Sequence, residues 1–362
     1  MLLFLLRRIG LMIITALCLT LVVFYLTNLP AKLETLAKTQ AGSRMTDAEV
    51  DNWLDRNGYN APVLVRYGEW LGVIPGWTRS TEDGTVTGRC VGFADDNPEA
   101  AGDRCGLLQG QWGFSTRFSN DVSDVLSARL GATGLLMLWV LIVMVPMALL
   151  LGILAGMREG SRTDRSLSTV AIVTTATPEY VSGVVFIALL ASSGIGLSPF
   201  LVNLGVIEGP VLFQGNARSA LESITFSNFT LPVMTVALYG MGYIARITRA
   251  SMTEVMTQQY IRTARLKGVS FGKIVVKHAL RNALIAPFTV IMLQIPWLLN
   301  GVVISEVLFS YPGFGWTLYE AAVNNDIELL LASSVVAVVV VLITQLISDI
   351  GYVYLNPRIR IS

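Results

Sequence analysis

The sequence predicts an all-α polytopic membrane protein with six transmembrane helices and an extracytoplasmic subdomain between the first two spans. Three observations support this fold class. Hydrophobic residues make up 53% of the 362 residues and charged residues only 14%, whereas an average soluble domain is about 25% charged. Six apolar stretches approach or exceed the roughly 20 residues that a spanning helix needs. The basic residues gather in the short segments on one side of these stretches.

The six predicted spans are Ile9 to Leu29, Leu135 to Met157, Thr169 to Ser193, Phe229 to Ala245, Ala283 to Ile304 and Leu329 to Ile347. The fourth is the shortest and has Pro232 near its start. Proline inside a span is tolerated because neighbouring helices can satisfy the freed backbone groups. A cleaved signal peptide is the alternative for the first stretch, but its apolar run is too long and no small-x-small cleavage site follows it.

The distribution of basic residues predicts the orientation, because Lys and Arg are retained on the cytoplasmic side. The termini and the segments after spans two and four hold fifteen Lys and Arg residues against three acids, Glu159, Asp164 and Glu254. The segment 31–130 holds ten cations and fourteen acids. We therefore expect residues 1–30 to form a cytoplasmic N-terminus and first span, 31–130 an outer subdomain, and 131–362 a five-span core whose C-terminus is cytoplasmic.

Local patterns predict the contents of the outer subdomain. Thr46-x-x-Glu49 is a capping box that opens a helix, which should end near Gly58, and a second short helix is expected from Val63 to Leu71. A Gly-rich stretch then carries Cys90 and Cys105. Outside the cytoplasm two such thiols favour a disulfide, and two free thiols are the alternative.

Composition and motifs argue against catalysis in this chain. The 26 Lys and Arg nearly cancel the 25 Asp and Glu, so net charge indicates no nucleic-acid partner. His278 is the single histidine and has no nucleophile beside it, and three cysteines exclude a Cys-rich zinc module. Gly272-Lys273 is not part of a nucleotide-binding loop, because Ile274 follows it and the upstream glycine is missing. We expect no catalytic residue, no metal site and no resident cofactor.

The cytoplasmic segment 254–281 has a recognisable local design. Gly268 can end a helix in the left-handed conformation, and Ser270 can cap the next one. Because Ala264 is small and Gly268 has no side chain, the surface of another protein could approach closely here. The alternative is a helical hairpin whose cations only fix the orientation, and spacing alone does not choose between the two.

Several motifs of the chain, in order, resemble those of ABC-importer permeases, and more narrowly of the dipeptide/oligopeptide permease family. The cytoplasmic signature is Tyr260-Ile-Arg-Thr-Ala-Arg-Leu-Lys-Gly268, followed by His278-Ala-Leu-Arg-Asn282. Other matching stretches are Leu6-Arg7-Arg8, Gly113-Phe-Ser115, Ala176-Thr-Pro178-Glu-Tyr180, Leu231-Pro232, Gly301 to Gly315 and Asp349 to Arg360.

This resemblance implies a non-catalytic permease subunit of the bacterial inner membrane that pairs with a second, homologous permease subunit. Two cytoplasmic ATPase subunits would carry ATP and Mg, and a periplasmic substrate-binding protein would deliver di- or oligopeptides. Relatives that carry opines, oligosaccharides, nickel chelates or peptide antibiotics keep the substrate open, and no nucleic-acid partner is implied. The resemblance assigns the ATPase contact to Tyr260, Arg262, Thr263, Ala264, Arg265, Lys267 and Gly268.

Some positions depart from the family pattern. Asn356 stands where the family usually has Asp, and Asn325-Asp326-Ile327-Glu328 stands where it has Arg-Asp-Tyr-Pro. The Cys-bearing insert at 76–109 is longer than the family's usual loop. These departures leave the substrate and the docking surface for the binding protein open.

Two carboxylates fall within predicted spans, where charges usually face a cavity or a partner. Glu306 belongs to the family motif near the outer end of span five, which favours a structural or gate role. Glu179 either lines the pathway and meets a peptide's amino group, or is a hydrogen-bonded packing residue in either its ionised or its protonated form. An ion-coupled secondary transporter is the alternative class, but we find no repeated half of the kind common in such proteins.

Overall fold

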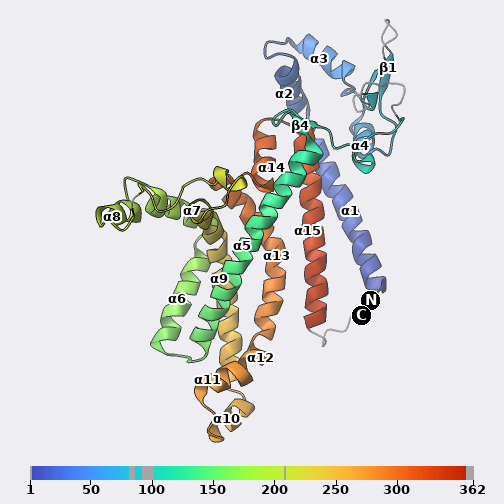
Figure 1. Cartoon of the computed structure of the whole chain (residues 1–362). Coiled ribbons are helices and arrows are strands. Elements are labelled where there is room, and N and C mark those ends of the chain that lie inside the picture. The colour runs from blue at the N-terminus through green and yellow to red at the C-terminus, as the bar shows by residue number, and fades with distance from the viewer. Residues whose placement is uncertain (1, 81–85, 92–101, 208, 356–362) are drawn as a thin grey trace. The chain divides into compact units, whose positions relative to one another are not determined.

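The computed structural model describes residues 2–80, 86–91, 102–207 and 209–355 (Figure 1). Within these ranges regular structure is mostly helical, and the strands form two short antiparallel pairs. The all-α fold class is therefore confirmed. The chain divides into two compact units, Met1–Arg129 with Thr317–Val340 and Leu130–Trp316 with Val341–Ser362. The outer subdomain expected over 31–130 overlaps the first unit, whose first segment ends at Arg129 and which also includes the first span and residues 317–340.

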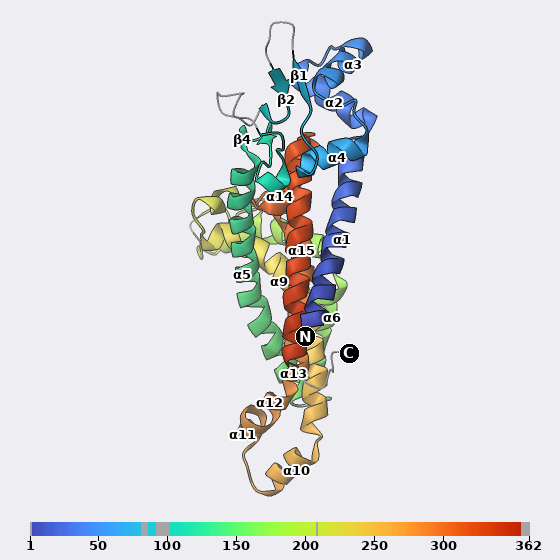
Figure 2. The same ribbon diagram turned by 90° about the vertical axis from the view of Figure 1, so that its right-hand side faces the viewer.

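In the first unit, α1 (Leu2–Thr27) leads into α2 (Pro30–Ala41), α3 (Asp47–Arg56) and α4 (Val63–Leu71). Both predicted short helices are confirmed. The backbone N–H and Oγ1 of Thr46 donate to Oε2 of Glu49 at 2.7 and 2.9 Å, which opens α3. Gly58 follows the end of α3 in the left-handed conformation, with φ +75°. The core of the unit joins α1, α2, α4 and the start of α15 (Ile327–Leu355) through Phe24, Leu33, Leu36, Trp70, Ile327, Leu331 and Val335 (Figure 2).

The insert after α4 forms a small hairpin that a disulfide closes. β1 (Thr78–Ser80) pairs with β2 (Val86–Gly88), with Thr78 opposite Gly88, and η3 (Leu107–Gln109) follows. Cys90 and Cys105 are bonded to each other in the structure, with their Cα atoms 5.3 Å apart, and both are buried. Residues 81–85 and 92–101 of the predicted insert lie outside the described residues.

Two segments more than 200 positions apart in the chain meet in the first unit. β3 (Phe114–Ser115) pairs with β4 (Asn120–Asp121) just before α5 (Val122–Gly156). Oδ2 of Asp326 accepts hydrogen bonds from Ser115 Oγ at 2.7 Å and from the Arg117 N–H at 3.1 Å. Oε2 of Glu328 accepts one from the Phe114 N–H at 2.8 Å. The Asn325–Glu328 segment, which departs from the family pattern, therefore holds the stretch that precedes the second predicted span.

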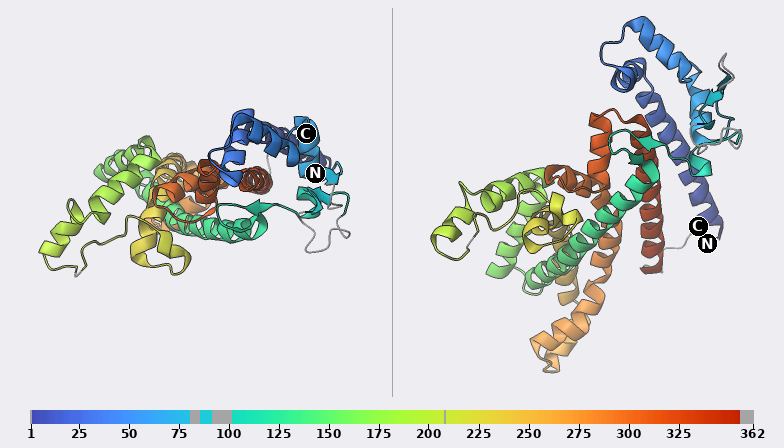
Figure 3. Two further views of the ribbon diagram at one scale, coloured as in Figure 1. Left: turned by 90° about the horizontal axis from the view of Figure 1, so that it is seen from above. Right: turned by 45° about the horizontal axis from the view of Figure 1, so that its top comes forward.

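The second unit is a bundle of helices. Its elements after α5 are α6 (Arg162–Ala176), α7 (Glu179–Phe186), η4 (Ile187–Ala191), α8 (Leu197–Asn203), η5 (Arg218–Leu221), α9 (Phe226–Met256), α10 (Gln259–Leu266), α11 (Phe271–Lys273), η6 (Ile274–Ala279), α12 (Leu280–Ala283) and α13 (Ile285–Leu308), with α14 (Phe314–Val323) next along the chain. Small residues permit close packing: a Cβ on Gly152 would lie 2.6 Å from the Ala245 carbonyl oxygen of α9. The segment around α8 extends away from the rest of this unit (Figure 3).

The predicted count of six spans is not confirmed. Among the described residues, three helices are long and apolar enough to cross a membrane, α1, α5 and α15, and two bent pairs raise the number to five. α6 and α7 meet at 102°, because Pro178 disfavours a helical conformation at Thr177. The second pair bends by 49° between residues 283 and 285. α9 contains the predicted fourth span but is not among these helices, and it also carries Arg246, Arg249 and Glu254.

Candidate functional site

The segment 254–281 folds as a helical loop with its own small core. It extends beyond the ends of α9 and α13 (Figure 2). Its buried apolar side chains pack together with those of the adjoining helix ends: Met252, Met256, Ile261, Ala264, Ile274, Val275, Ala279 and Ala283. The loop therefore has a defined shape that does not depend on a partner.

Gly268 ends α10 as the sequence predicts. Its φ is +73°, and the N–H groups of Val269 and Gly268 donate to the carbonyl oxygens of Ala264 and Arg265 at 3.2 and 3.0 Å. This is the Schellman arrangement that favours glycine. Ser270 stands at the predicted cap position in extended conformation, but its side chain makes no capping hydrogen bond.

The predicted contact residues of the loop differ in their exposure to solvent. Ala264 is only 8% exposed and faces the loop's own core. Tyr260 is exposed, and its hydroxyl accepts a hydrogen bond from Asn282 Nδ2 at 2.9 Å. The side chains of Arg262, Thr263, Arg265 and Lys267 are exposed, and Gly268 lies at the surface.

Sequence reasoning missed the apolar part of this surface. Leu266 is 82% exposed, and Val276 is 69% exposed. Phe271 adds a third exposed apolar side chain on the same loop, with the guanidinium carbon of Arg158 5.2 Å from its ring centroid. The available signal was Leu266, which stands inside the cationic motif but does not share the helix face of Ile261 and Ala264 that fills the core.

Glu306 is fully buried and fully hydrogen-bonded. Oε1 accepts from Thr133 Oγ1 at 2.5 Å, and Oε2 accepts from the N–H groups of Gly315 and Trp316 at 2.7 and 3.1 Å. Thr133 Oγ1 in turn accepts from the Phe314 N–H at 2.7 Å. The carboxylate thus fastens the start of α14 to α5, and its surroundings are those of a structural anchor.

Glu179 has the opposite surroundings. It is the first residue of α7, directly after the 102° break, and is 7% exposed. Its Oε1 has no hydrogen-bond partner among the described residues. A Cβ on Gly301 of α13 would lie 2.6 Å from its Oε2, so the carboxylate occupies the bare face of that helix. The two carboxylates that the sequence singled out therefore differ in chemistry.

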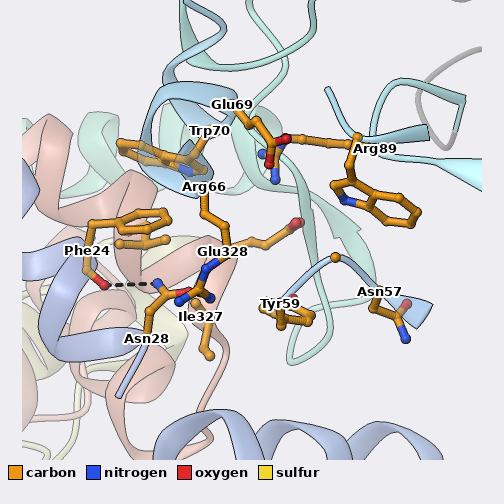
Figure 4. A pocket seen from close by; sticks show the side chains of 13 residues that line it. Phe24, Asn28, Asn57, Tyr59, Arg66, Glu69, Trp70, Arg89, Ile327 and Glu328 are labelled. Carbon is orange, nitrogen blue, oxygen red and sulfur yellow. Dashed lines mark hydrogen bonds between the residues drawn. The ribbon is translucent and has the colours of Figure 1, made fainter. Parts of the chain in front are cut away.

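A cavity of about 70 Å³ lies within the first unit (Figure 4). Asn28 donates to the Phe24 carbonyl at 2.9 Å and accepts from Arg66 Nη1 at 2.8 Å. Burial raises the pKa of Glu69, lowers that of Arg66 and raises the pKa of Tyr59 to about 12. Acidic and basic side chains both line the cavity, so its charge selects neither an anion nor a cation.

Comparisons with known proteins match most of the chain. The family model described as "Binding-protein-dependent transport system inner membrane component" matches residues 148–361. The oligopeptide transport system permease protein AppB of Bacillus subtilis is 29% identical, over 88% of this chain and 87% of its own length. The di/tripeptide permease DppB of Pseudomonas aeruginosa is 29% identical over 99% of both. The dipeptide permease DppB of Haemophilus influenzae is 31% identical over 70% of this chain and 78% of its own length.

Proposed function

Because the chain belongs to the family of binding-protein-dependent transport system inner membrane components, we propose that it is one of two permease subunits of an ATP-driven importer for di- or oligopeptides. The substrate class follows the relatives, which are peptide permeases by name. The partners would be a homologous permease subunit, two cytoplasmic ATPases that bind ATP and Mg, and a periplasmic binding protein. This chain would supply the path and a lever, not the chemistry.

The surface of the 254–281 loop is the observation that carries the proposal. Leu266, Val276 and Phe271 give this one loop three exposed apolar side chains, and burial against a partner would remove their apolar surface from water. Four exposed cationic or polar residues, Arg262, Thr263, Arg265 and Lys267, surround Leu266, which is the composition of a docking site with an apolar centre and a polar rim. A docked ATPase would therefore move the loop as one body.

The loop is connected to the bundle in a way that would pass such a motion on. It continues directly from α9 and leads into α13, and Ser251 Oγ of α9 donates to the Ala283 carbonyl of α12 at 2.8 Å. ATP-driven closure of the ATPases would then rock α9 and α13 together. In the proposed orientation both termini and this loop are cytoplasmic, and residues 31–130 are outside.

Reconstituted uptake tests the proposal. The chain, its permease partner and the ATPases are placed in liposomes, and labelled dialanine is supplied with the binding protein. We expect uptake that requires both ATP and the binding protein. Uptake driven by an ion gradient in liposomes that lack the ATPases would contradict the proposal and favour a secondary transporter.

A further inference from the structure

We propose that Glu179, with the stacked rings of Tyr239 and Trp297, forms a site for a protonated amino group of the transported solute, such as the terminal ammonium group of a short peptide. The inference rests on the proposed function, because it places the site inside a peptide permease. The three residues come from α7, α9 and α13, which pack against one another in the second unit (Figure 1).

The Glu179 carboxylate is buried with one oxygen that no described residue satisfies. Burial of a charged group without hydrogen-bond donors is costly, and Oε1 of Glu179 is buried with no partner among the residues that the structure describes. Glu306, in the same unit, shows how the fold satisfies a carboxylate that serves structure, with donors on both oxygens. Ionisable residues within spans commonly mark a solute or ion pathway, so we assign the missing donor of Oε1 to the transported solute.

The break between α6 and α7 places this carboxylate at the free end of a helix. Glu179 follows Pro178 and is the first residue of α7, so its carboxylate lies at the break and not inside a continuous helix. Discontinuous helices of this kind hold solute sites in other transporters, because their ends present unpaired groups. The bend of 102° turns that end toward the neighbouring helices instead of continuing α6.

Helix spacing then relates the carboxylate to α13. The Glu179 carboxylate lies against Gly301. Residues four apart share a helix face, so Trp297 lies on the face of α13 that the carboxylate covers, about 6 Å along the helix. The backbone position of Trp297 is therefore about one turn along α13 from the position that the carboxylate covers.

Helix spacing also relates α7 to Tyr239 of α9. Gly183, one turn after Glu179 on α7, faces Thr235 of α9, whose Cγ2 would lie 3.1 Å from an added Cβ. Tyr239 is four residues beyond Thr235 and so shares its face. The rings of Tyr239 and Trp297 stack with centroids 4.6 Å apart, which independently joins the two faces.

Carboxylate and aromatic faces together select a cation. Both rings are partly exposed, whereas Glu179 is buried, so the rings are the more accessible part of the proposed site. Aromatic faces attract ammonium groups, and a carboxylate oxygen without donors accepts their hydrogen bonds. A solute whose amino group is acetylated offers neither the charge nor these donors.

Equilibrium binding of trialanine and N-acetyltrialanine to the assembled transporter tests the site. The transporter is placed in nanodiscs without nucleotide or binding protein, so that only the membrane part is probed. We expect Glu179→Gln to weaken trialanine binding at least tenfold. Glu222→Gln, the same change at an exposed position, should leave it unchanged. The wild-type protein should bind N-acetyltrialanine as weakly as Glu179→Gln binds trialanine.

Equal trialanine affinity of the wild type and Glu179→Gln would overturn the inference, as would equal wild-type affinity for the two peptides or no saturable binding. The comparison of peptides on the wild type needs no variant, so it decides even if Glu179→Gln fails to assemble. ATP-driven dialanine uptake separates this result from the proposed function. Normal dialanine uptake, together with trialanine binding that does not depend on Glu179, contradicts only the proposed site. Absent dialanine uptake by the wild type contradicts the proposed peptide importer itself.

Discussion

Arg249 and Asp164 form a two-point ion pair that joins α9 to the start of α6. Nε of Arg249 lies 2.5 Å from Oδ1 of Asp164, and Nη2 lies 2.8 Å from Oδ2. The carboxylate also accepts hydrogen bonds from the Gly160 N–H and from Ser168 Oγ, at 2.9 and 3.0 Å. The pair therefore fixes the turn between α5 and α6 to α9, whose end continues into the 254–281 loop.

Loss of the arginine should destabilise the protein. Arg249→Met leaves the Asp164 side chain, which is 3% exposed, without its counter-charge; because Arg249 itself is 33% exposed, the cost should fall below that of a fully buried pair, at about 2 kcal/mol. Arg246→Met removes the same charge from an exposed position of α9 and should cost under ~0.5 kcal/mol. Thermal denaturation in detergent measures both. Equal melting temperatures for the two variants would show that the pair does not hold α6 to α9.

The hydroxyl of Thr133 should matter through Glu306. Thr133→Val keeps the side-chain shape but removes the donor to Glu306 Oε1 and the acceptor of the Phe314 N–H, which should cost about 2 kcal/mol because both groups are buried. Thr169→Val is the control, because this hydroxyl is exposed and donates to the Arg165 carbonyl of its own helix. Similar melting temperatures for Thr133→Val and Thr169→Val would show that Glu306 does not anchor this part of the fold.

The Cys90–Cys105 disulfide should form in the membrane-inserted protein. Closing a loop with a sequence separation of 15 stabilises the insert by about 3 kcal/mol in the chain-entropy model. Peptide mapping without reductant should find the two cysteines linked and Cys18 free. Recovery of Cys90 and Cys105 as alkylated free thiols would contradict this prediction.

The orientation can be tested with single cysteines. Pro75 and Ser270 are both exposed in the structure. In a Cys18→Ser background that keeps the disulfide, Pro75→Cys should react with an impermeant maleimide in intact spheroplasts, and Ser270→Cys should react only after lysis. The reverse pattern would invert the proposed topology.

Local patterns predicted the short helices, the capping box at Thr46 and the left-handed Gly268, because neighbouring residues alone decide these features. The bend at Pro178 also had a local signal, but proline is so often tolerated inside spans that it did not predict a break. The hydrogen bonds from Ser115 and Phe114 to Asp326 and Glu328 could not be predicted, since they join segments more than 200 positions apart.

The sequence predicted which residues form the candidate site, but not which of their side chains face the loop's core and which face solvent. The resemblance selected the right segment, but the spacing did not reveal that Ala264 faces inward while Leu266 faces outward. Glu179 and Glu306 looked alike as carboxylates within spans. Only the donors supplied by Thr133, Gly315 and Trp316 separate the anchored carboxylate from the unpaired one.

In the proposed function the 254–281 loop connects this permease to the ATPases, and Leu266→Asp tests this connection most directly. The side chain is 82% exposed and lies outside the loop's core, so the variant should fold and insert normally. A buried charge at the apolar centre of an interface is costly, so we expect ATPase association and peptide uptake to fall at least tenfold.

Leu64→Asp, the same change at a 68% exposed leucine of α4, is the matched control. The measurement is co-purification of the ATPases with each variant at equal membrane abundance, together with ATP-driven dialanine uptake. We expect Leu266→Asp to lose both ATPase association and uptake, and Leu64→Asp to keep normal ATPase association. Wild-type ATPase association and uptake by Leu266→Asp would contradict this expectation.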